Sequence, residues 1–296
     1  MHTVHLHVNN LPPLETIPSR PSETAVLLVR PTYYDIVYEI NPHMKGNIGS
    51  VDLQKAERQW CTIRDTYQKL GYTIHVLDGI QGLPDMVFCA NQSFPFLNSE
   101  GKHSVLLSHM ASDYRKDEVK HIEEWYLEQG YKSYHQSEPY VPFEGMGDAI
   151  WHPGKRLAYI GYGFRTRKDA LQRISAGIDF EVVGLELIQP HFYHLDTALS
   201  VINEETAIYV KEAFSDDGVA ILEAMFTDLI RVPLEEAKYG FVTNGHCPDG
   251  KNFIVHKGNS QTKEALEKRG LTIWELDTSE FMKAGGSVFC MKMMLP

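Results

Sequence analysis

Length, composition and charge place the chain among soluble globular proteins. It has 296 residues, of which 43% are hydrophobic and 23% are charged, and this is enough for a large core. The formal net charge of -11 disfavours nucleic acid or an anionic membrane surface as partners, because both require clustered Lys and Arg. The N-terminus lacks a signal-peptide pattern and no apolar run approaches a membrane span, so we expect a cytoplasmic protein. Four cysteines without a C-x-x-C pair indicate reduced thiols.

We expect a single domain over residues 1–296. Residues 1–22 form a leader that is rich in proline from Leu11 to Pro21. Two alternatives stay open for this leader, since such a segment is either partly disordered or packs over the surface. The sequence also leaves open whether the protein is a homo-oligomer.

The clearest predicted helix covers about residues 50–70. Its apolar residues recur at steps of four and three, which is the spacing of one helix face. Ser50 is the candidate N-cap and Gly71 the candidate stop. The next segment, 72–77, is rich in aromatic and branched residues and is predicted to be a strand.

This unit of helix, glycine and strand recurs along the chain. The repeats are 118–129 and 131–135 around Gly130, 168–176 and 180–185 around Gly177, and 263–269 and 271–276 around Gly270. A further instance without a glycine fits a helix over 218–230 followed by a strand over 231–233. Five units are therefore predicted.

Each unit is followed by a loop of small and polar residues. These loops are 84–91, 143–148, 191–196, 241–244 and 284–290. Further strands are predicted after them, as at 104–107 and 157–160, and the segments 26–29 and 291–295 could pair to close a ring. Repeats of roughly 40 to 60 residues are typical of propellers. An α/β domain without symmetry would show the same alternation, but the recurring polar loop favours the ring.

Cys290 is a candidate nucleophile. A cysteine thiolate needs access and a supporting environment, and two glycines just before Cys290 allow a ligand to approach the backbone closely. Taken alone, a cysteine in an apolar run near a C-terminus is more often a core residue.

His194 and Asp196 form an H-x-D pattern that is compatible with a strand, where alternate residues face the same side. The histidine could move protons while the aspartate holds a cation. An isolated pattern of this kind is more often exposed on a strand surface, and His191 is a less well placed competitor for the histidine role.

Glu144 and Asp148 flank two glycines in a turn-like segment where one acid could orient His194. A solvated acidic turn would look the same. No ligand spacing in these residues supports a metal site.

The segment 161–165 lacks the third glycine of a dinucleotide loop, so we reject a nucleotide site. Arg165 could instead bind a carboxylate, or form an ordinary surface ion pair.

Taken together, the segments 84–91, 143–148, 192–196 and 283–290 resemble those of the guanidino-group modifying enzymes of the pentein, or amidinotransferase, superfamily. The resemblance runs from Arg30 to Cys290 and is greatest to the arginine dihydrolases, in the segments 34–48, 161–166 and 192–197. It implies one catalytic domain with the fold of a five-bladed, pseudo-fivefold α/β propeller. It also implies a small guanidino compound as partner and no cofactor.

The resemblance implies a role for each candidate residue. Cys290 would attack the guanidinium carbon, His194 would protonate the leaving ammonia and then activate water, and Glu144 would hold His194. Asp196 would bind the guanidinium nitrogens, and Asn41 and Arg165 the amino acid end. The full set of expected substrate-binding residues is Asn91, Asp196, Asn41, Arg165, Asp148 and Asn244.

Asn91 bears on the extent of the reaction. Deiminases and dimethylarginine hydrolases usually have an aspartate there, whereas the dihydrolases have asparagine. Two carboxylates bind a cationic guanidinium tightly, but an amide also accommodates the neutral ureido group of citrulline. We therefore expect hydrolysis of arginine through citrulline to ornithine, ammonia and carbon dioxide.

The chain departs from the pattern of the arginine dihydrolases at one position that bears on the substrate. The dihydrolases carry a carboxylate-binding arginine in the strand after the Asn91 loop, where this chain has His109. A neutral histidine cannot form a bidentate ion pair. The α-carboxylate is then held differently, or the substrate differs at that end.

Three alternatives stay open. The reaction could stop at citrulline, starting from arginine or from a methylated arginine. An amidinotransferase would use a second amine in place of water. A catalytically silent pentein would bind a partner, although the presence of the cysteine, the histidine and both acids argues against this.

Overall fold

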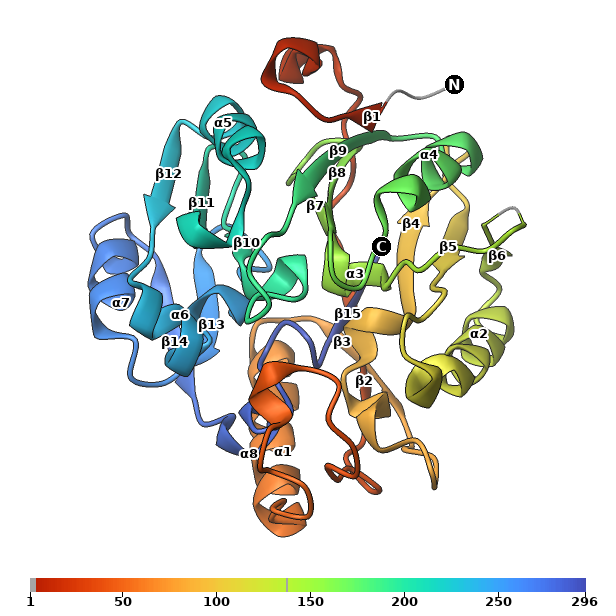
Figure 1. Cartoon of the computed structure of the whole chain (residues 1–296), viewed down its shortest axis with the longest axis vertical. Helices are drawn as coiled ribbons and strands as arrows, with labels where there is room; N and C mark the ends of the chain where they lie inside the picture. Colours follow the sequence, from red (N-terminus) through yellow and green to blue (C-terminus); the bar gives the residue numbers. More distant parts are fainter. Residues whose placement is uncertain (1–3, 137) are drawn as a thin grey trace.

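Five small sheets surround the centre of the molecule. The computed structural model describes residues 4–136 and 138–296, and the strands in these residues form five separate sheets. Each sheet contains two parallel strands joined by a helix, and these helices lie at the periphery (Figure 1). The units are β2 (Ala25–Val29), α1 (Leu53–Lys69) and β3 (Thr73–Leu77); β5 (His103–Leu107), α2 (Lys116–Glu128) and β6 (Lys132–Tyr134); β8 (Leu157–Tyr162), α4 (Lys168–Gly177) and β9 (Glu181–Glu186); β11 (Thr206–Tyr209), α5 (Asp216–Met225) and β12 (Asp228–Arg231); and β13 (Asn252–His256), α7 (Ser260–Glu267) and β14 (Thr272–Leu276).

Four of these sheets have a third, antiparallel strand. These strands are β4 (Ser93–Leu97) beside β5, β7 (Ala149–Trp151) beside β8, β10 (Leu199–Val201) beside β11, and β15 (Met293–Leu295) beside β2. In the fifth sheet an isolated antiparallel bridge joins His246 to Ile254 of β13. The pairing of β15 with β2 places Met293 opposite Leu27, so the predicted closure between the two ends of the chain is confirmed. The mixed α/β class is confirmed as well.

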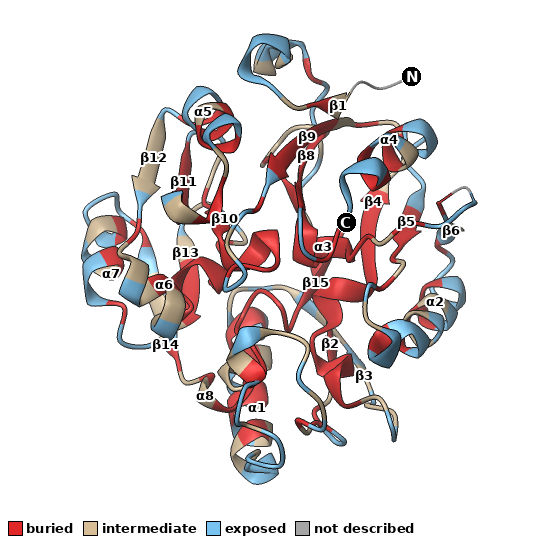
Figure 2. Ribbon diagram, in the orientation of Figure 1, coloured by how far each residue is buried: buried red, intermediate tan, exposed pale blue. Residues whose placement is uncertain are grey.

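Burial explains why the units fold this way. Every residue of β2 is buried, and α1 buries Ala56, Trp60, Ile63 and Tyr67 along one face. Fully burying a large apolar side chain contributes roughly 1.5–3 kcal/mol, so this face alone holds α1 against its sheet. Figure 2 shows the same division throughout, with buried strands near the centre and exposed outer faces on the helices.

The predicted glycine stops are largely confirmed. Gly71, Gly130 and Gly270 follow α1, α2 and α7 with positive φ, a conformation that only glycine adopts without strain. Gly177 differs, because it is the last residue of α4 and has no positive φ.

Three local predictions were wrong. The N-cap of α1 is Asp52, whose side chain accepts a hydrogen bond from Lys55 N, because the helix begins after the position expected from Ser50. The predicted helix over 218–230 ends at Met225, and its last residues form β12 instead. His194 and Asp196 do not lie on a strand: Asp196 lies in a short 3-10 helix (Leu195–Thr197), and His194 precedes it.

Part of the predicted leader packs on the domain. β1 (Val4–His5) pairs in parallel with β9, Ser19 bridges to Lys155, and Ile17 is buried. Residues 1–3 lie outside the described residues.

The remaining short helices are α3 (Gly145–Asp148), α6 (Leu234–Gly240) and α8 (Ser279–Met282). No helix within residues 4–136 and 138–296 is long and apolar enough to cross a membrane.

Candidate active site

The five polar loops enter the site from five different sheets. In four of them a short helical turn or loop leads directly into the antiparallel strand: Asn91 precedes β4, Glu144 precedes α3 and β7, His194 and Asp196 precede β10, and Cys290 precedes β15. Asn244 lies in the 3-10 helix Val242–Asn244, just before the bridge to β13. These strands lie near the centre in Figure 1, so residues distant in sequence meet there.

Cys290 is buried, at 2% exposure, and has two side-chain partners. Its thiol donates to Asp196 Oδ2 at 2.9 Å, and Asn244 Nδ2 donates to its Sγ at 3.1 Å. Burial, followed by the charge of Asp196, raises the pKa of Cys290 well above its ordinary value. Without a ligand, the protonated thiol is therefore the stable form at neutral pH.

His194 is held by Glu144. Its Nε2 lies 2.6 Å from Glu144 Oε2, and both side chains are buried. An ionised carboxylate can only accept, so Nε2 carries a proton in this contact. Nδ1 has no hydrogen-bond partner in the described structure, so it is available to a ligand.

Glu144 is kept ionised by its neighbours. Burial alone would raise its pKa, but Arg165 and the hydrogen bond from His194 outweigh burial and hold the pKa below its ordinary value. Arg165 Nη1 donates to Glu144 Oε2 at 3.2 Å, and Ala111 N donates to Oε1 at 2.9 Å. Glu144 therefore joins the histidine to a buried arginine.

Arg165 also reaches the segment before residue 41. Its Nη2 donates to Ile40 O at 2.7 Å, and the guanidinium lies 5.0 Å from the centre of the Tyr193 ring. Asn41 Nδ2 donates to Ala284 O at 3.0 Å, and its Oδ1 caps the 3-10 helix Pro42–Met44. These contacts tie the segment around Asn41 to the loop that carries Cys290.

The two aspartates of the site differ in their partners. Burial raises the pKa of Asp196 to about 7, against the lowering effects of Cys290 and Lys292, and its Oδ1 has no partner in the described structure. Burial raises the pKa of Asp148 to about 6, although His194 opposes it. Both oxygens of Asp148 are occupied, by Leu195 N and the Thr166 hydroxyl.

Asn244 is also fully engaged. Its Oδ1 accepts from Ser287 N at 2.7 Å and from Cys290 N at 3.4 Å, and its Nδ2 donates to Asp196 O as well as to the Cys290 sulfur. The side chain therefore fixes the loop of Cys290 relative to the loop of Asp196.

Asn91 has a partner that the sequence did not indicate. Arg115 Nη1 donates to Asn91 Oδ1 at 2.7 Å, while Asn91 Nδ2 is buried without a partner in the described structure. Arg115 is 3% exposed and also pairs with Glu118, with 2.8 Å between Nη2 and Oε2. It donates further to the carbonyls of Asp85 and Phe88.

A small pocket joins most of these residues. Of the predicted residues, Asn41, Asn91, Arg165, His194 and Cys290 line it, whereas Glu144, Asp148, Asp196 and Asn244 lie behind its wall and contact the lining residues or one another. Two further charged side chains that line it, Arg115 and Asp85, were missed. Asp85 accepts from Tyr38 through Oδ2, but its Oδ1 has no partner in the described structure.

The free volume of this pocket is only about 10 Å³, roughly that needed to hold one water. A larger ligand can therefore enter only if the lining moves, and Ile40, Asn41 and Met44 belong to a connecting segment rather than to a sheet.

His109 does not line the pocket. It stacks on Tyr140, with 5.2 Å between ring centres, and its backbone pairs with Phe143.

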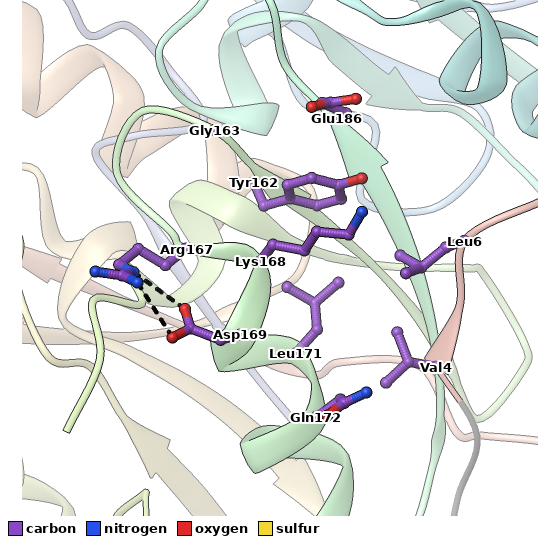
Figure 3. A pocket seen from close by; sticks show the side chains of 10 residues that line it. All are labelled: Val4, Leu6, Tyr162, Gly163, Arg167, Lys168, Asp169, Leu171, Gln172 and Glu186. Carbon is purple, nitrogen blue, oxygen red and sulfur yellow. Dashed lines mark hydrogen bonds and ion pairs between the residues drawn. The ribbon is translucent and has the colours of Figure 1, made fainter. Parts of the chain in front are cut away.

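A wider groove of about 620 Å³ lies elsewhere, between β1 and α4. Figure 3 shows its residues, in which Arg167 is paired with Asp169 and Lys168 extends beside Tyr162. None of the predicted site residues lines this groove, so its size does not make it the candidate site.

Comparison with known proteins gives the family. The family model for eukaryotic N,N dimethylarginine dimethylhydrolase matches residues 43–295. The chain belongs to this family. The resemblance to guanidino-modifying enzymes of the pentein superfamily is thereby confirmed, and the family places the chain among amidinohydrolases.

Individual relatives divide between two activities. The N(G),N(G)-dimethylarginine dimethylaminohydrolase of Mycobacterium tuberculosis is 35% identical over 88% of this chain and 82% of that protein. The bifunctional arginine dihydrolase/ornithine cyclodeaminase ArgZ of Synechocystis is 32% identical over 90% of this chain, which covers 37% of that longer protein. An uncharacterized protein of Caenorhabditis elegans is 34% identical over 91% of this chain and 93% of its own length.

Solved structures of relatives share the fold. The product-bound N-terminal domain of ArgZ, a cyanobacterial arginine dihydrolase, superposes with a TM-score of 0.86 at 30% identity, over 93% of this chain and 98% of that domain. The Pseudomonas aeruginosa dimethylarginine dimethylaminohydrolase, in complex with citrulline, gives a TM-score of 0.77 at 21% identity, over 93% of this chain and all of the other.

Proposed function

We propose that this chain is an arginine dihydrolase, which converts arginine through citrulline to ornithine, ammonia and carbon dioxide. We further propose that the whole chain is one catalytic domain whose five sheets are the blades of an α/β propeller. Two observations support the second proposal. Every sheet contains the order strand, helix and strand, and each sheet contributes one polar loop to the candidate site.

The orientation of Asn91 carries the functional proposal. A guanidinium has only donors, so Arg115 takes the Oδ1 of Asn91 and leaves the amide N–H groups without a partner in the described structure. A free N–H suits the carbonyl oxygen of a ureido group, which is present in citrulline and absent from arginine. An aspartate here could offer only acceptors while ionised, and would favour the guanidinium alone.

The first half of the reaction uses the carboxylates. Asp196 Oδ1 and Asp85 Oδ1 are buried carboxylate oxygens at the site that have no partner in the described structure, and a guanidinium supplies the N–H donors that they lack. Its positive charge would also stabilise the thiolate of Cys290, which burial disfavours. The thiolate then attacks the guanidinium carbon, and the C–N bond to the departing nitrogen breaks.

His194 provides the proton transfers. Its protonated form would give the proton to the leaving ammonia, after which the neutral ring accepts a proton from the attacking water. Water then adds to the carbon of the thiouronium intermediate and the C–S bond breaks, which releases citrulline and regenerates Cys290. Glu144 fixes the ring through Nε2, so these transfers would pass through Nδ1.

In a second attack, Cys290 would bond to the ureido carbon while its terminal nitrogen leaves as ammonia. Water would then break the C–S bond of this thiocarbamate, and the carbamate released would split into ornithine and carbon dioxide. In total, two waters are consumed and two ammonia molecules and one carbon dioxide are released for each arginine. We propose that Asp148 and Asn244 position the loops of His194 and Cys290, because their polar atoms are already occupied, while Arg165 and Asn41 remain candidates for the amino acid end.

The second candidate is a hydrolase that stops at citrulline, acting on arginine or on a dimethylated arginine. The family model and the Mycobacterium tuberculosis relative favour it. It requires no donor at position 91, and the unpartnered Nδ2 of Asn91 would then stay unused in a buried site. Leaving a buried donor unpaired costs about 1–3 kcal/mol.

The test is to incubate the purified protein separately with arginine, citrulline and dimethylarginine, and to quantify ammonia, citrulline and ornithine. Ornithine formed from both arginine and citrulline supports the dihydrolase. Citrulline that accumulates from arginine without ornithine overturns it. Cys290→Ser is the control, because all covalent turnover should disappear while the fold remains.

A further inference from the structure

A second pocket lies apart from the candidate active site and shares no lining residue with it. Its volume is about 280 Å³. Its walls come from segments that converge behind the Cys290 loop: 20–23, 146–154, 201–204, 246–250 and 289–294. No step of the proposed reaction uses these walls.

Lys292 is the unusual residue of this pocket. It is one of the residues around the pocket, and at 0% exposure it is fully enclosed by protein. Its Nζ has no hydrogen-bond partner in the described structure and lies 3.3 Å from the centre of the Phe289 ring. An aromatic face attracts a cation but accepts no strong hydrogen bond, so the amine still lacks an acceptor.

Keeping a buried amine charged costs free energy when it has no hydrogen-bond acceptor. Burial lowers the pKa of Lys292 to about 7, although Glu23 and Asp196 oppose this. His246, which lines the same pocket, does not compete as a cation, because burial and Lys292 lower its pKa and its Nδ1 bonds to Tyr67 at 2.8 Å.

Arg20 supplies a second donor in the pocket. Its Nη1 pairs with Glu23 Oε1 at 2.9 Å and its guanidinium lies 4.6 Å from the centre of the Trp151 ring, but its buried Nε has no partner in the described structure. Two nitrogen donors without acceptors therefore line one pocket, and what they lack is an anionic oxygen.

The remaining charges limit the ligand. Glu23, Glu204 and Asp249 also line the pocket, and their negative charge opposes an ion that carries two or more negative charges, such as a phosphate ester. The same acids attract an ammonium group. A pocket of this volume is slightly smaller than those that hold drug-sized ligands.

We propose that this pocket, which we call the Lys292 pocket, binds a small carboxylate of amino-acid size. The carboxylate lies against Lys292 and the ammonium group of the amino acid faces the acidic rim. This site is independent of the proposed reaction. Lys292 follows Cys290 by two positions, and its charge acts on Asp196, so occupancy would also change the electrostatic environment of the active site.

Calorimetric titration with glycine and with acetate tests the proposal, since the two differ by the ammonium group. The wild-type chain is expected to bind glycine saturably at one site, and Lys292→Met to bind it at least about tenfold more weakly. Methionine keeps the length and removes a buried amine, so the variant should unfold no lower in temperature than the wild type. Cys290→Ser, whose side chain lines only the other pocket, should bind glycine as the wild type does.

Equal glycine affinity in Lys292→Met and wild type would overturn the site, as would the absence of saturable binding to a folded wild type. Glu204→Gln tests the orientation: weaker glycine binding with unchanged acetate binding supports the amino acid, and an equal effect on both overturns it.

Methyl NMR of the unmutated protein gives a measurement that needs no variant. Met146 and Met294 line the Lys292 pocket, whereas Met44 lines the active-site pocket. With methionine methyl groups labelled, glycine should shift the signals of Met146 and Met294 and leave that of Met44 unchanged. A shift confined to Met44 would place the ligand in the other pocket and overturn the proposal.

Discussion

Arg115 donates from Nη1 to Asn91 Oδ1 at 2.7 Å, and this bond fixes which end of the amide faces Arg115. Arg115 is itself fixed by Glu118 and by two backbone carbonyls, so it cannot turn away without losing several buried hydrogen bonds. Asn91 is thereby held with its N–H groups free. In the proposed reaction, the choice between one hydrolysis and two depends on this pair.

Asn91→Asp tests that relationship. The variant should still consume arginine, because a carboxylate accepts from the guanidinium, but it should convert citrulline to ornithine about 5 to 100 times more slowly, since the ureido oxygen loses its donor. Product ratios from arginine, measured by chromatography, should shift from ornithine to citrulline. An unchanged rate of ornithine formation from citrulline would show that the Asn91 donor has no part in the second step.

Glu144→Gln tests the support of His194. Proton transfer by a correctly held base typically contributes 10² to 10⁴ in rate, so kcat should fall by about 10² or more. The variant should also lose roughly 3 kcal/mol of stability, because Arg165 stays buried without its charged partner. Steady-state kinetics and urea denaturation measure the two effects.

Glu212→Gln is the matched control for that change. Glu212 pairs with Arg231 at the surface, where ion pairs contribute about 0–1 kcal/mol. Its activity and stability should therefore stay close to those of the wild type. If Glu144→Gln kept full activity and lost no more stability than Glu212→Gln, the proposed support of His194 would be wrong.

The sequence could predict Cys290, His194 and Glu144 as candidates because each lies in a loop of small and polar residues at a repeating place in the chain, and the structure brings them together. It placed His194 and Asp196 on a strand because the H-x-D spacing fits a strand. A 3-10 helix gives a different geometry, and only the surrounding loops determine that choice.

Arg115 and Lys292 were missed for a physical reason. Arg115 lies beside Lys116 and Asp117 at the start of α2, where an arginine is usually exposed, and its burial depends on carbonyls about thirty residues earlier. Lys292 is a single charge in an apolar run. No local pattern shows that a pocket from five distant segments surrounds it.

The Asn41 side chain has two roles that variants can separate: it caps a 3-10 helix, and it donates a hydrogen bond to the loop of Cys290. Asn41→Ala removes the cap of the 3-10 helix Pro42–Met44 and the bond to Ala284 O, whereas Asn41→Asp keeps an accepting oxygen and loses only the donor. We expect both variants to raise KM for arginine, and only the alanine variant to lose about 1 kcal/mol of stability. A KM increase in Asn41→Ala alone would assign the effect to the cap instead of the contact with the Cys290 loop.

Asp196 makes stability depend on pH in a defined direction. Burial raises its pKa to about 7 in the folded protein, so between about pH 4 and pH 7 the folded chain binds this proton more tightly than the unfolded chain. The contribution is fully present below the unfolded pKa and is lost as the pH rises through about 7. Asp196→Asn cannot titrate. Its stability relative to wild type should therefore rise with pH over this window, by up to about 4 kcal/mol.

Urea denaturation of both proteins at several pH values checks this, because the other titrating groups are common to both and largely cancel in the difference. Asp148→Asn is the matched comparison: burial raises the pKa of Asp148 only to about 6, so its difference from wild type should level off at a lower pH. A difference for Asp196→Asn that does not change with pH would mean that Asp196 stays ionised when folded. Its thiol contact with Cys290 would then oppose thiolate formation at every pH, and arginine would have to supply all of the compensating charge.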